Sequence, residues 1–298
     1  MTSHCTSRRT WIQQSSAAAA FCVAASKMSW ADQPTKKILF FNRSAGFEHS
    51  VVKRDGEAPS FAERMMTEFG KKHRFEVMST KDGRVFEKDY RDFDAFFFYT
   101  TEDLTTEGGD RQPPMSKQGK MNFLEAISAG KGFAGAHCAS DTFHTAGDRT
   151  KGQETPDPYI AMIGGEFIRH GQQQTATMHV VDKQFQGLEG VREDFDLQEE
   201  WYSLKNFAPD MHVLLVQETE GMKDADYQRP AYPATWIRKH GQGRVFYTSM
   251  GHREDVWTNP IFEKVLMGGM NWILQRFDAD TTANLAEVTP QAGVLPKL

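Results

Sequence analysis

The sequence predicts an α/β domain built around a mostly parallel β-sheet that gains antiparallel strands. Two patterns support this fold class. In the first half of the chain, short apolar runs alternate with helical patterns, as in the crossover units of parallel sheets. In the second half, predicted strands follow one another with few helices between them, which favours antiparallel pairing. About 265 residues beyond the N-terminal segment suffice to bury the core of one such domain.

Four strands are predicted in the first half, and each is a nearly continuous apolar run, as expected for strands that are covered on both faces. They are residues 37–42, 74–79, 93–100 and 131–137. Helices are predicted at residues 60–69 and 116–127. Ser116 suits the N-cap of the second helix because its hydroxyl can accept a hydrogen bond from the first turn.

Four more strands are predicted in the second half, at residues 175–181, 212–218, 232–239 and 244–250. The segment Gly241-Gln242-Gly243 predicts a hairpin between the last two. The clearest helix begins with Asn259 as N-cap and Pro260 in the first turn, and its apolar side contains Ile261, Phe262, Val265, Leu266, Trp272 and Ile273. The domain is expected to span residues 32–280, followed by a surface strap or loose tail at 281–298.

Residues 1–31 are typical of a cleaved export signal. They contain Arg8 and Arg9, a weakly apolar run at 17–25, and a small-x-small cleavage site that ends at Ala31. The paired arginines followed by Trp11 favour the twin-arginine route, and an ordinary secretory signal is the alternative. The apolar run is shorter than the roughly 20 residues of a membrane span. The mature protein is therefore expected in the periplasm or outside the cell.

The net charge and the cysteine content exclude several classes of partner and fold. Residues 1–31 contain three basic residues and no acidic one, so their removal changes the formal net charge from −5 to −8. An acidic chain repels phosphate backbones and anionic lipid, so neither nucleic acid nor a membrane surface is expected as a partner. Cys138 is the one cysteine beyond the signal, so no intrachain disulfide is expected. The oligomeric state stays open, and a homo-oligomer is one alternative.

Histidines follow three of the predicted strands. His49 follows the first strand, His137 and His144 follow the fourth, and His252 follows the last. Ligands of open α/β sheets bind beyond the carboxyl ends of the strands. We therefore expect these histidines to meet at one edge of the sheet.

The segment from His137 to Asp141 is the first candidate for chemistry. Small residues surround His137, as a tight strand-to-helix turn requires, and Asp141 could orient its imidazole or share a cation. Alternatively, His137 ends a buried strand and bonds only to backbone. Cys138 beside a histidine suggests a nucleophile, although a small buried cysteine is the favoured interpretation.

Two further motifs combine acids with rings. His252 and Glu254 stand two residues apart, so the carboxylate could hold the imidazole, although a solvated turn is the alternative. Glu200 and Tyr202 flank Trp201. Acids beside aromatic rings are suited to binding a sugar, although this segment could instead be a corner of the core.

A metal site is a further prediction, because imidazole and carboxylate ligands without thiolate suit a divalent cation such as zinc. The candidate ligands are His49, His137, His170, Glu200 and His252.

Four segments stand out together, at residues 132–142, 164–170, 199–202 and 243–252. In this order they resemble the trehalose-utilisation (ThuA-like) family, and the likeness covers about residues 36–277. The resemblance implies a three-layer α/β/α sandwich of the class I glutamine amidotransferase-like (flavodoxin-like) kind. Amidotransferases have a cysteine at the elbow where His137 stands here, so glutamine hydrolysis through a thioester is not expected. His252 and Glu254 keep the His-x-Glu spacing of the amidotransferase late strand.

The resemblance implies a role in bacterial carbohydrate utilisation. We expect an exported enzyme that acts on glycosides or 3-keto-sugar derivatives by hydrolysis or elimination. His137 or His252 would move a proton while Asp141 and Glu254 fix the rings. Substrate would be bound by His49, Glu200, Tyr202 and His144, and a divalent cation could polarise a carbonyl. The alternatives are a carbohydrate-binding protein without catalysis and a scaffold that recruits a partner through its acidic surface.

Overall fold

The computed structural model describes residues 1, 2, 35–191 and 193–297. The predicted export signal at residues 1–31 falls outside the described residues apart from its first two, so it stays a prediction. The segment Thr35–Leu298 forms one compact unit. No helix among the described residues is both long and apolar enough to cross a membrane.

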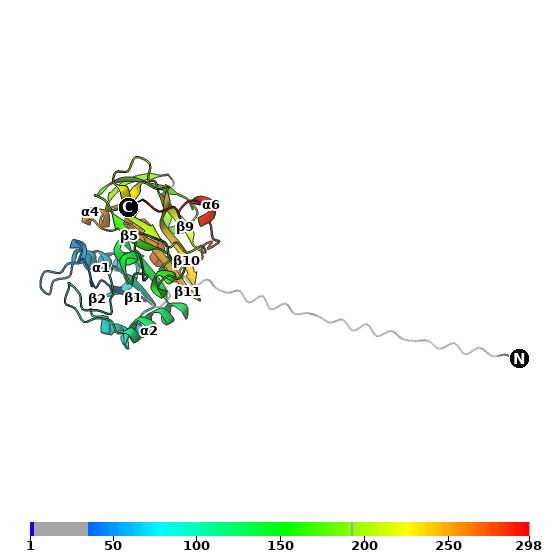
Figure 1. Ribbon diagram of the computed structural model, residues 1–298. Helices are drawn as coiled ribbons and strands as arrows, with labels where there is room; N and C mark the ends of the chain where they lie inside the picture. Colours follow the sequence, from blue (N-terminus) through cyan, green and yellow to red (C-terminus); the bar gives the residue numbers. More distant parts are fainter. Residues whose placement is uncertain (3–34, 192, 298) are drawn as a thin grey trace. The chain divides into compact units, whose positions relative to one another are not determined.

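Five parallel strands form one half of the main sheet, and the described part of the chain gives that sheet nine strands in all (Figure 1). In spatial order the five are β2 (Phe75–Thr80), β1 (Lys36–Phe41), β3 (Ala95–Phe98), β4 (Gly132–Ala136) and β11 (Gly243–Thr248). The predicted strands in these places are confirmed to within two residues. This 2-1-3-4-5 order is the doubly wound arrangement, which places a ligand crevice at the carboxyl edge between β1 and β3.

Antiparallel strands continue the sheet from β11, as predicted. They are β10 (Tyr232–His240), β9 (His212–Gln217), β6 (Gln174–Val180) and β7 (Phe195–Glu199). The predicted hairpin between β10 and β11 is confirmed. The sequence did not predict β7, nor the separate pair β5 (Glu166–His170) and β8 (Tyr202–Lys205). These strands are short, and β5 and β7 contain charged residues of low strand propensity.

The predicted helices are confirmed, and their capping residues explain where they begin. Ser60 and Glu63 form a capping box at α1 (Phe61–His73), and the Ser116 hydroxyl accepts from Gly119 at α2 (Lys117–Ser128). Asn259 caps α5 (Pro260–Ile273). Shorter helices are α3 (Pro158–Ile163), α4 (Glu254–Trp257) and α6 (Leu285–Val288), with 3₁₀ turns η2 (Ser50–Val52), η3 (Gly83–Phe86), η4 (Asp89–Asp92), η5 (His137–Asp141), η6 (Gln186–Leu188) and η7 (Ala225–Tyr227).

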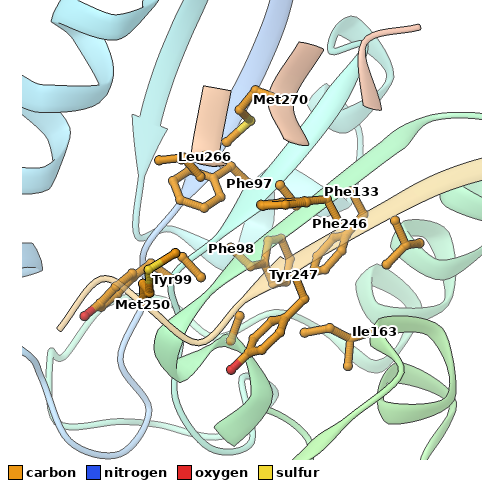
Figure 2. Close-up of a cluster of buried hydrophobic side chains, with 14 of the residues drawn as sticks. Phe97, Phe98, Tyr99, Phe133, Ile163, Phe246, Tyr247, Met250, Leu266 and Met270 are labelled. Atoms are coloured by element: carbon orange, nitrogen blue, oxygen red, sulfur yellow. The ribbon is translucent and has the colours of Figure 1, made fainter. Parts of the chain in front are cut away.

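Helices cover both faces of the parallel strands, so the fold is a three-layer sandwich. Successive strand residues point to opposite faces. On one face, Phe97 lies beside Leu266 and Met270 of α5 (Figure 2). On the other face the next residue, Phe98, stacks on Phe123 of α2, with ring centroids 4.6 Å apart. On the second of these faces Tyr159 of α3 also stacks on Phe98. Both faces are therefore buried, as the continuous apolar runs predicted.

The segment that follows α5 lies against β9. The side chain of Asn284 accepts a hydrogen bond from the Val213 backbone at 2.7 Å, and its backbone N–H donates to Met211 at 3.2 Å. The buried Arg229 donates to the carbonyl of Ala292 at 2.6 Å. These bonds hold two described residues of this segment, Asn284 and Ala292, against the rest of the domain.

Candidate functional site

Three histidines meet at the carboxyl edge of the sheet because the strands before them are parallel. His49 follows β1, His137 follows β4 and His252 follows β11. The ring centroid of His49 lies 5.0 Å from that of His137 and 5.2 Å from that of His252. The remaining pair, His137 and His252, is 5.1 Å apart. The predicted convergence of these three loops is confirmed.

Glu200 reaches the same edge from the antiparallel half of the sheet. It follows β7, and four antiparallel pairings separate β7 from β11. Each antiparallel pairing reverses strand direction, so an even number of them gives β7 the direction of β11. The carboxyl end of β7 therefore faces the histidines.

Together these side chains form a compact group of possible ligands. One donor atom from each of the four lies within 4.8 Å of all the others. Nδ1 of His252 is 3.2 Å from Nε2 of His137 and 3.1 Å from Oε2 of Glu200. Nε2 of His137 is 3.5 Å from the same Glu200 oxygen. We call His49, His137, Glu200 and His252 the four-residue centre.

The backbone at His137 directs its ring into the centre. His137 has φ +46°, in the left-handed region that side chains with a Cβ seldom adopt, so the predicted strained elbow is confirmed. Its Nδ1 lies 3.1 Å from the carbonyl of Ser249. A carbonyl only accepts, so Nδ1 holds the proton and donates, and Nε2 presents its lone pair to the centre. The backbone carbonyl of Ser249 thus satisfies Nδ1 of His137, and the lone pair of Nε2 is left to bind a ligand or accept a proton in the centre.

His49 is the second buried imidazole of the centre. It is 3% exposed, and Nε2 lies 3.4 Å from the hydroxyl of Tyr202. Among the described residues, Nδ1 of His49 has no hydrogen-bond partner. A buried nitrogen without a partner is costly, so it indicates a group held for a ligand.

Burial and neighbouring charges set the protonation of the centre. Burial lowers the pKa of His137 to about 4 and, together with the other histidines, holds the pKa of His49 well below its usual value. Burial opposes ionisation of Glu200, but the neighbouring imidazoles of His137 and His252 outweigh burial and lower the pKa of that carboxyl. Burial likewise lowers the pKa of His252, but the bond to Glu200 outweighs burial and raises it. At neutral pH two neutral imidazoles therefore lie beside a carboxylate.

Glu199 positions the centre, a role that the sequence analysis did not assign to it. It is fully buried, and its Oε2 accepts from the N–H groups of Gly251 at 2.8 Å and His252 at 3.1 Å. Its Oε1 accepts from the N–H of Glu200 at 2.8 Å. Burial raises the pKa of Glu199 to about 7, against the effect of these donors. The carboxyl group thus ties the β7 end to the loop of His252, a role that no local pattern could indicate.

His170 and Tyr202 form the outer wall of the centre. They are register partners in β5 and β8, and their rings stack with centroids 5.8 Å apart. Nδ1 of His170 lies 3.5 Å from Oε1 of Glu200, and its side chain is 41% exposed. Tyr202 also packs on His137 at 4.1 Å. Of the five predicted ligands, four therefore share one centre, and His170 lies outside it, across Glu200.

The structure corrects the predicted role of Asp141 beside His137. Asp141 bonds instead to Nε2 of His144, at 2.6 Å. The other ring nitrogen of His144 lies 3.2 Å from Glu166, which is fully buried. Burial lowers the pKa of His144, but the two carboxylates outweigh burial and raise it to about 9. His144, predicted to bind substrate, is thus held as an imidazolium between two acids.

The predicted partnership of Glu254 with His252 is also wrong in the structure. Oε1 of Glu254 accepts from the hydroxyl of Ser50 at 2.7 Å, so it connects α4 to η2 instead. Glu200 takes the place beside His252. Cys138 is buried, and burial raises the pKa of its thiol well above the usual value, which fits the inert interpretation.

The fold and the centre define a doubly wound α/β protein with an imidazole–carboxylate group at the carboxyl edge of its sheet. The family model for trehalose utilisation, ThuA, matches residues 37–273, so the chain belongs to the ThuA family. Comparison with curated proteins found no match.

Solved structures agree with this fold. A ThuA-like protein from Bacteroides uniformis has 18% identity and a TM-score of 0.60, with 83% of this chain and 94% of that chain covered. A ThuA-like protein from Parabacteroides merdae has 16% identity and a TM-score of 0.57, with 83% and 92% covered. At such identity the likeness shows the fold alone.

Proposed function

We propose that this chain is an enzyme that acts on glycosides or 3-keto-sugar derivatives, by hydrolysis or elimination, and that its four-residue centre binds a divalent cation such as zinc. The observation behind the proposal is the spacing of the donor atoms. Ligands about 2.0–2.1 Å from a tetrahedral ion lie about 3.4 Å from one another. The pairs among His137, Glu200 and His252 are separated by 3.1, 3.2 and 3.5 Å.

The protonation of the centre also suits a cation. His137 donates from Nδ1 to a backbone carbonyl, which is the outer bond that orients a metal-binding imidazole. Burial keeps His49 and His137 neutral at pH 7, so neither has to lose a proton before it binds a metal. Three imidazoles with one carboxylate match zinc or a similar first-row ion.

A bound cation would polarise a sugar carbonyl or lower the pKa of a bound water. An imidazole nitrogen that binds a cation has no lone pair left for a proton. The proton-moving role expected of His137 or His252 would then pass to another group. His170 is the base that remains on the exposed side of Glu200.

Substrate recognition and export complete the proposal. Glu200, Tyr202 and His170 would contact sugar hydroxyls, and the family description, trehalose utilisation, supports a carbohydrate substrate.

We also propose that the protein is exported through a signal at residues 1–31. N-terminal sequencing of the protein recovered from the periplasm tests it, and a mature chain that still begins at Met1 would contradict it.

The test is metal analysis of the purified protein together with a product screen on glycosides and 3-keto-glycosides, with and without chelator. We expect about one ion per chain and loss of product formation with chelator. His252→Gln should lose the ion, whereas His240→Gln, at the far end of β10, should keep it. Product formation that survives in a His137→Gln, His252→Gln double variant would refute the proposal. Sugar affinity without turnover, unchanged by chelator, would support the alternative of a binding protein.

A further inference from the structure

Both ring nitrogens of His252 have polar neighbours, and these neighbours decide where the ring holds its proton. A neutral imidazole holds one proton, on either nitrogen, and the hydrogen bond at one nitrogen fixes the state of the other. Nδ1 of His252 points into the four-residue centre. Nε2 lies 3.0 Å from the side-chain nitrogen of Gln173, an exposed residue that directly precedes β6 and has no part in the proposed function.

Arg253 fixes the orientation of the Gln173 amide. Nη1 of Arg253 donates to Oε1 of Gln173 at 2.7 Å. A guanidinium only donates, so the atom of Gln173 that it meets has to be the oxygen. Asp255 holds the same guanidinium, because Nε and Nη2 donate to its two oxygens at 2.8 and 2.9 Å. The amide nitrogen, which is a donor, therefore faces Nε2 of His252, and Nε2 has to accept.

The inner side of the ring leads independently to the same proton position. Nδ1 of His252 lies 3.1 Å from Oε2 of Glu200 and 3.2 Å from Nε2 of His137. Both neighbours are acceptors, since Glu200 is a carboxylate and the proton of His137 lies on its Nδ1, bonded to the carbonyl of Ser249. Nδ1 of a neutral His252 therefore holds the proton. With the proton on Nε2 instead, two donors would face each other at Gln173.

The backbone around Gln173 is held by the loop before β10. The N–H of Gly171 donates to the hydroxyl of Tyr227 at 3.0 Å. The side chain of Gln174 accepts from the N–H of Lys223 at 2.7 Å. Gln173 stands between these two attachments, so its amide reaches His252 from a fixed position.

His252 differs in its outer hydrogen bond from His137. A metal-binding imidazole normally donates its outer N–H to an acceptor, and His137 does so to Ser249. The outer nitrogen of His252 faces a donor instead. Before Nδ1 of His252 can bind a cation, it has to give its proton to water, and Nε2 has to take one from water, so that the ring stays neutral. The Gln173 amide then has to turn, which brings its NH₂ group against the guanidinium of Arg253.

We propose that Gln173 is a positioning residue of the four-residue centre: together with Arg253 it holds the proton of neutral His252 on Nδ1, and so it limits the affinity of the centre for a cation. The position of the proton follows from the hydrogen bonds alone, whereas the limit on affinity rests on the proposed function. Glutamate at position 173 would remove the conflict, because a carboxylate accepts both from the guanidinium and from a protonated Nε2.

The first test is NMR of the ring nitrogens of His252 in ¹⁵N-labelled, chelator-treated protein, at a pH at which the wild-type ring is neutral. The ¹⁵N shifts distinguish a protonated ring nitrogen from an unprotonated one. We expect the proton on Nδ1 in the wild type and a proton on Nε2 in Gln173→Glu. Gln172→Glu adds the same charge at the neighbouring exposed residue and, as the matched control, should leave Nε2 unprotonated. A wild-type ring protonated at Nε2, or a Gln173→Glu ring without a proton there, would overturn the proposal.

Zinc affinity, measured by calorimetry on the same three proteins, tests the limit on cation binding. Gln173→Glu should bind zinc about tenfold more tightly than the wild type, because its carboxylate accepts from the outer N–H of His252. Gln172→Glu should bind zinc like the wild type. An equal gain in both variants would be a general effect of charge and would refute the limit. If none of the proteins binds zinc, the proposed metal centre fails and the limit fails with it, whereas the NMR result decides the position of the proton by itself.

Discussion

Replacing His144 with glutamine tests whether the Asp141–His144–Glu166 group stabilises the fold. His144 lies between two carboxylates, 2.6 Å from Asp141 and 3.2 Å from Glu166, and its side chain is 8% exposed. Both ring nitrogens therefore face acceptors, and the ring donates from both only when it is charged. Glutamine removes the charge and leaves two buried acids without their shared cation.

The magnitude follows from the pKa of His144, which the two carboxylates raise from 6.5 to about 9 against the effect of burial. A group with a raised pKa contributes its full stabilisation below the unfolded value of 6.5, and that stabilisation is lost as pH rises through about 9. The difference corresponds to about 3 kcal/mol. For a domain of this size that is a decrease in melting temperature of roughly 6–12 °C below pH 6.5.

Thermal unfolding of the wild type and of His144→Gln from pH 6 to pH 10 measures this difference. We expect the two melting curves to differ most at pH 6 and to converge above pH 9. Asp141→Asn should reproduce part of the loss, and the double variant should lose less than the sum of the single variants, because the residues are in contact. A melting difference that stays constant from pH 6 to pH 10 would refute the charged-pair argument.

Three further predictions concern the centre and the core. The Glu199 carboxylate accepts from the backbone N–H groups of Gly251, His252 and Glu200, and Glu199→Gln replaces one of its acceptor oxygens with a donor. The free energy of unfolding should therefore fall by about 1–3 kcal/mol. The control Glu220→Gln changes an exposed residue and should melt like the wild type. Glu200→Gln removes the carboxylate that raises the pKa of His252, so the NMR titration of His252 should move to lower pH, and an unmoved titration would contradict the assignment of Glu200 as its partner. Gly268→Ala would place a Cβ 2.0 Å from Cα of Gly187, so denaturant unfolding should show a loss of about 1–3 kcal/mol. Gly293→Ala has no heavy atom within 4 Å of its Cβ and should cost little, and equal losses at both glycines would contradict the packing argument.

Local sequence predicted much of the scaffold. Apolar runs such as residues 37–42 located the parallel strands, because a strand covered on both faces needs apolar residues at every position. Ser116 and Asn259 marked helix starts, because a capping side chain bonds within its own first turn. The convergence of His49, His137 and His252 also followed, since parallel strands end at one edge.

Only the tertiary structure assigned partners to the polar groups. Asp141 stands four residues from His137 but bonds to His144, because the left-handed turn at His137 sends that ring toward Ser249 and the centre. Spacing along a chain limits which groups can meet, but it does not decide which of several neighbours an acid will bond.

The sequence by itself determined the secondary structure of the parallel half and the three histidine loops, because both depend on the periodicity of side chains along a single segment. The sequence made Glu200 a candidate ligand beside these histidines, but only the tertiary structure decided that Glu200 joins them while His170 does not, and that Glu199 supports them. The direction of β7 depends on how many antiparallel pairings separate it from β11, and that number is a property of the assembled sheet. The contacts that form the centre are long-range, and no local pattern in the chain encodes them.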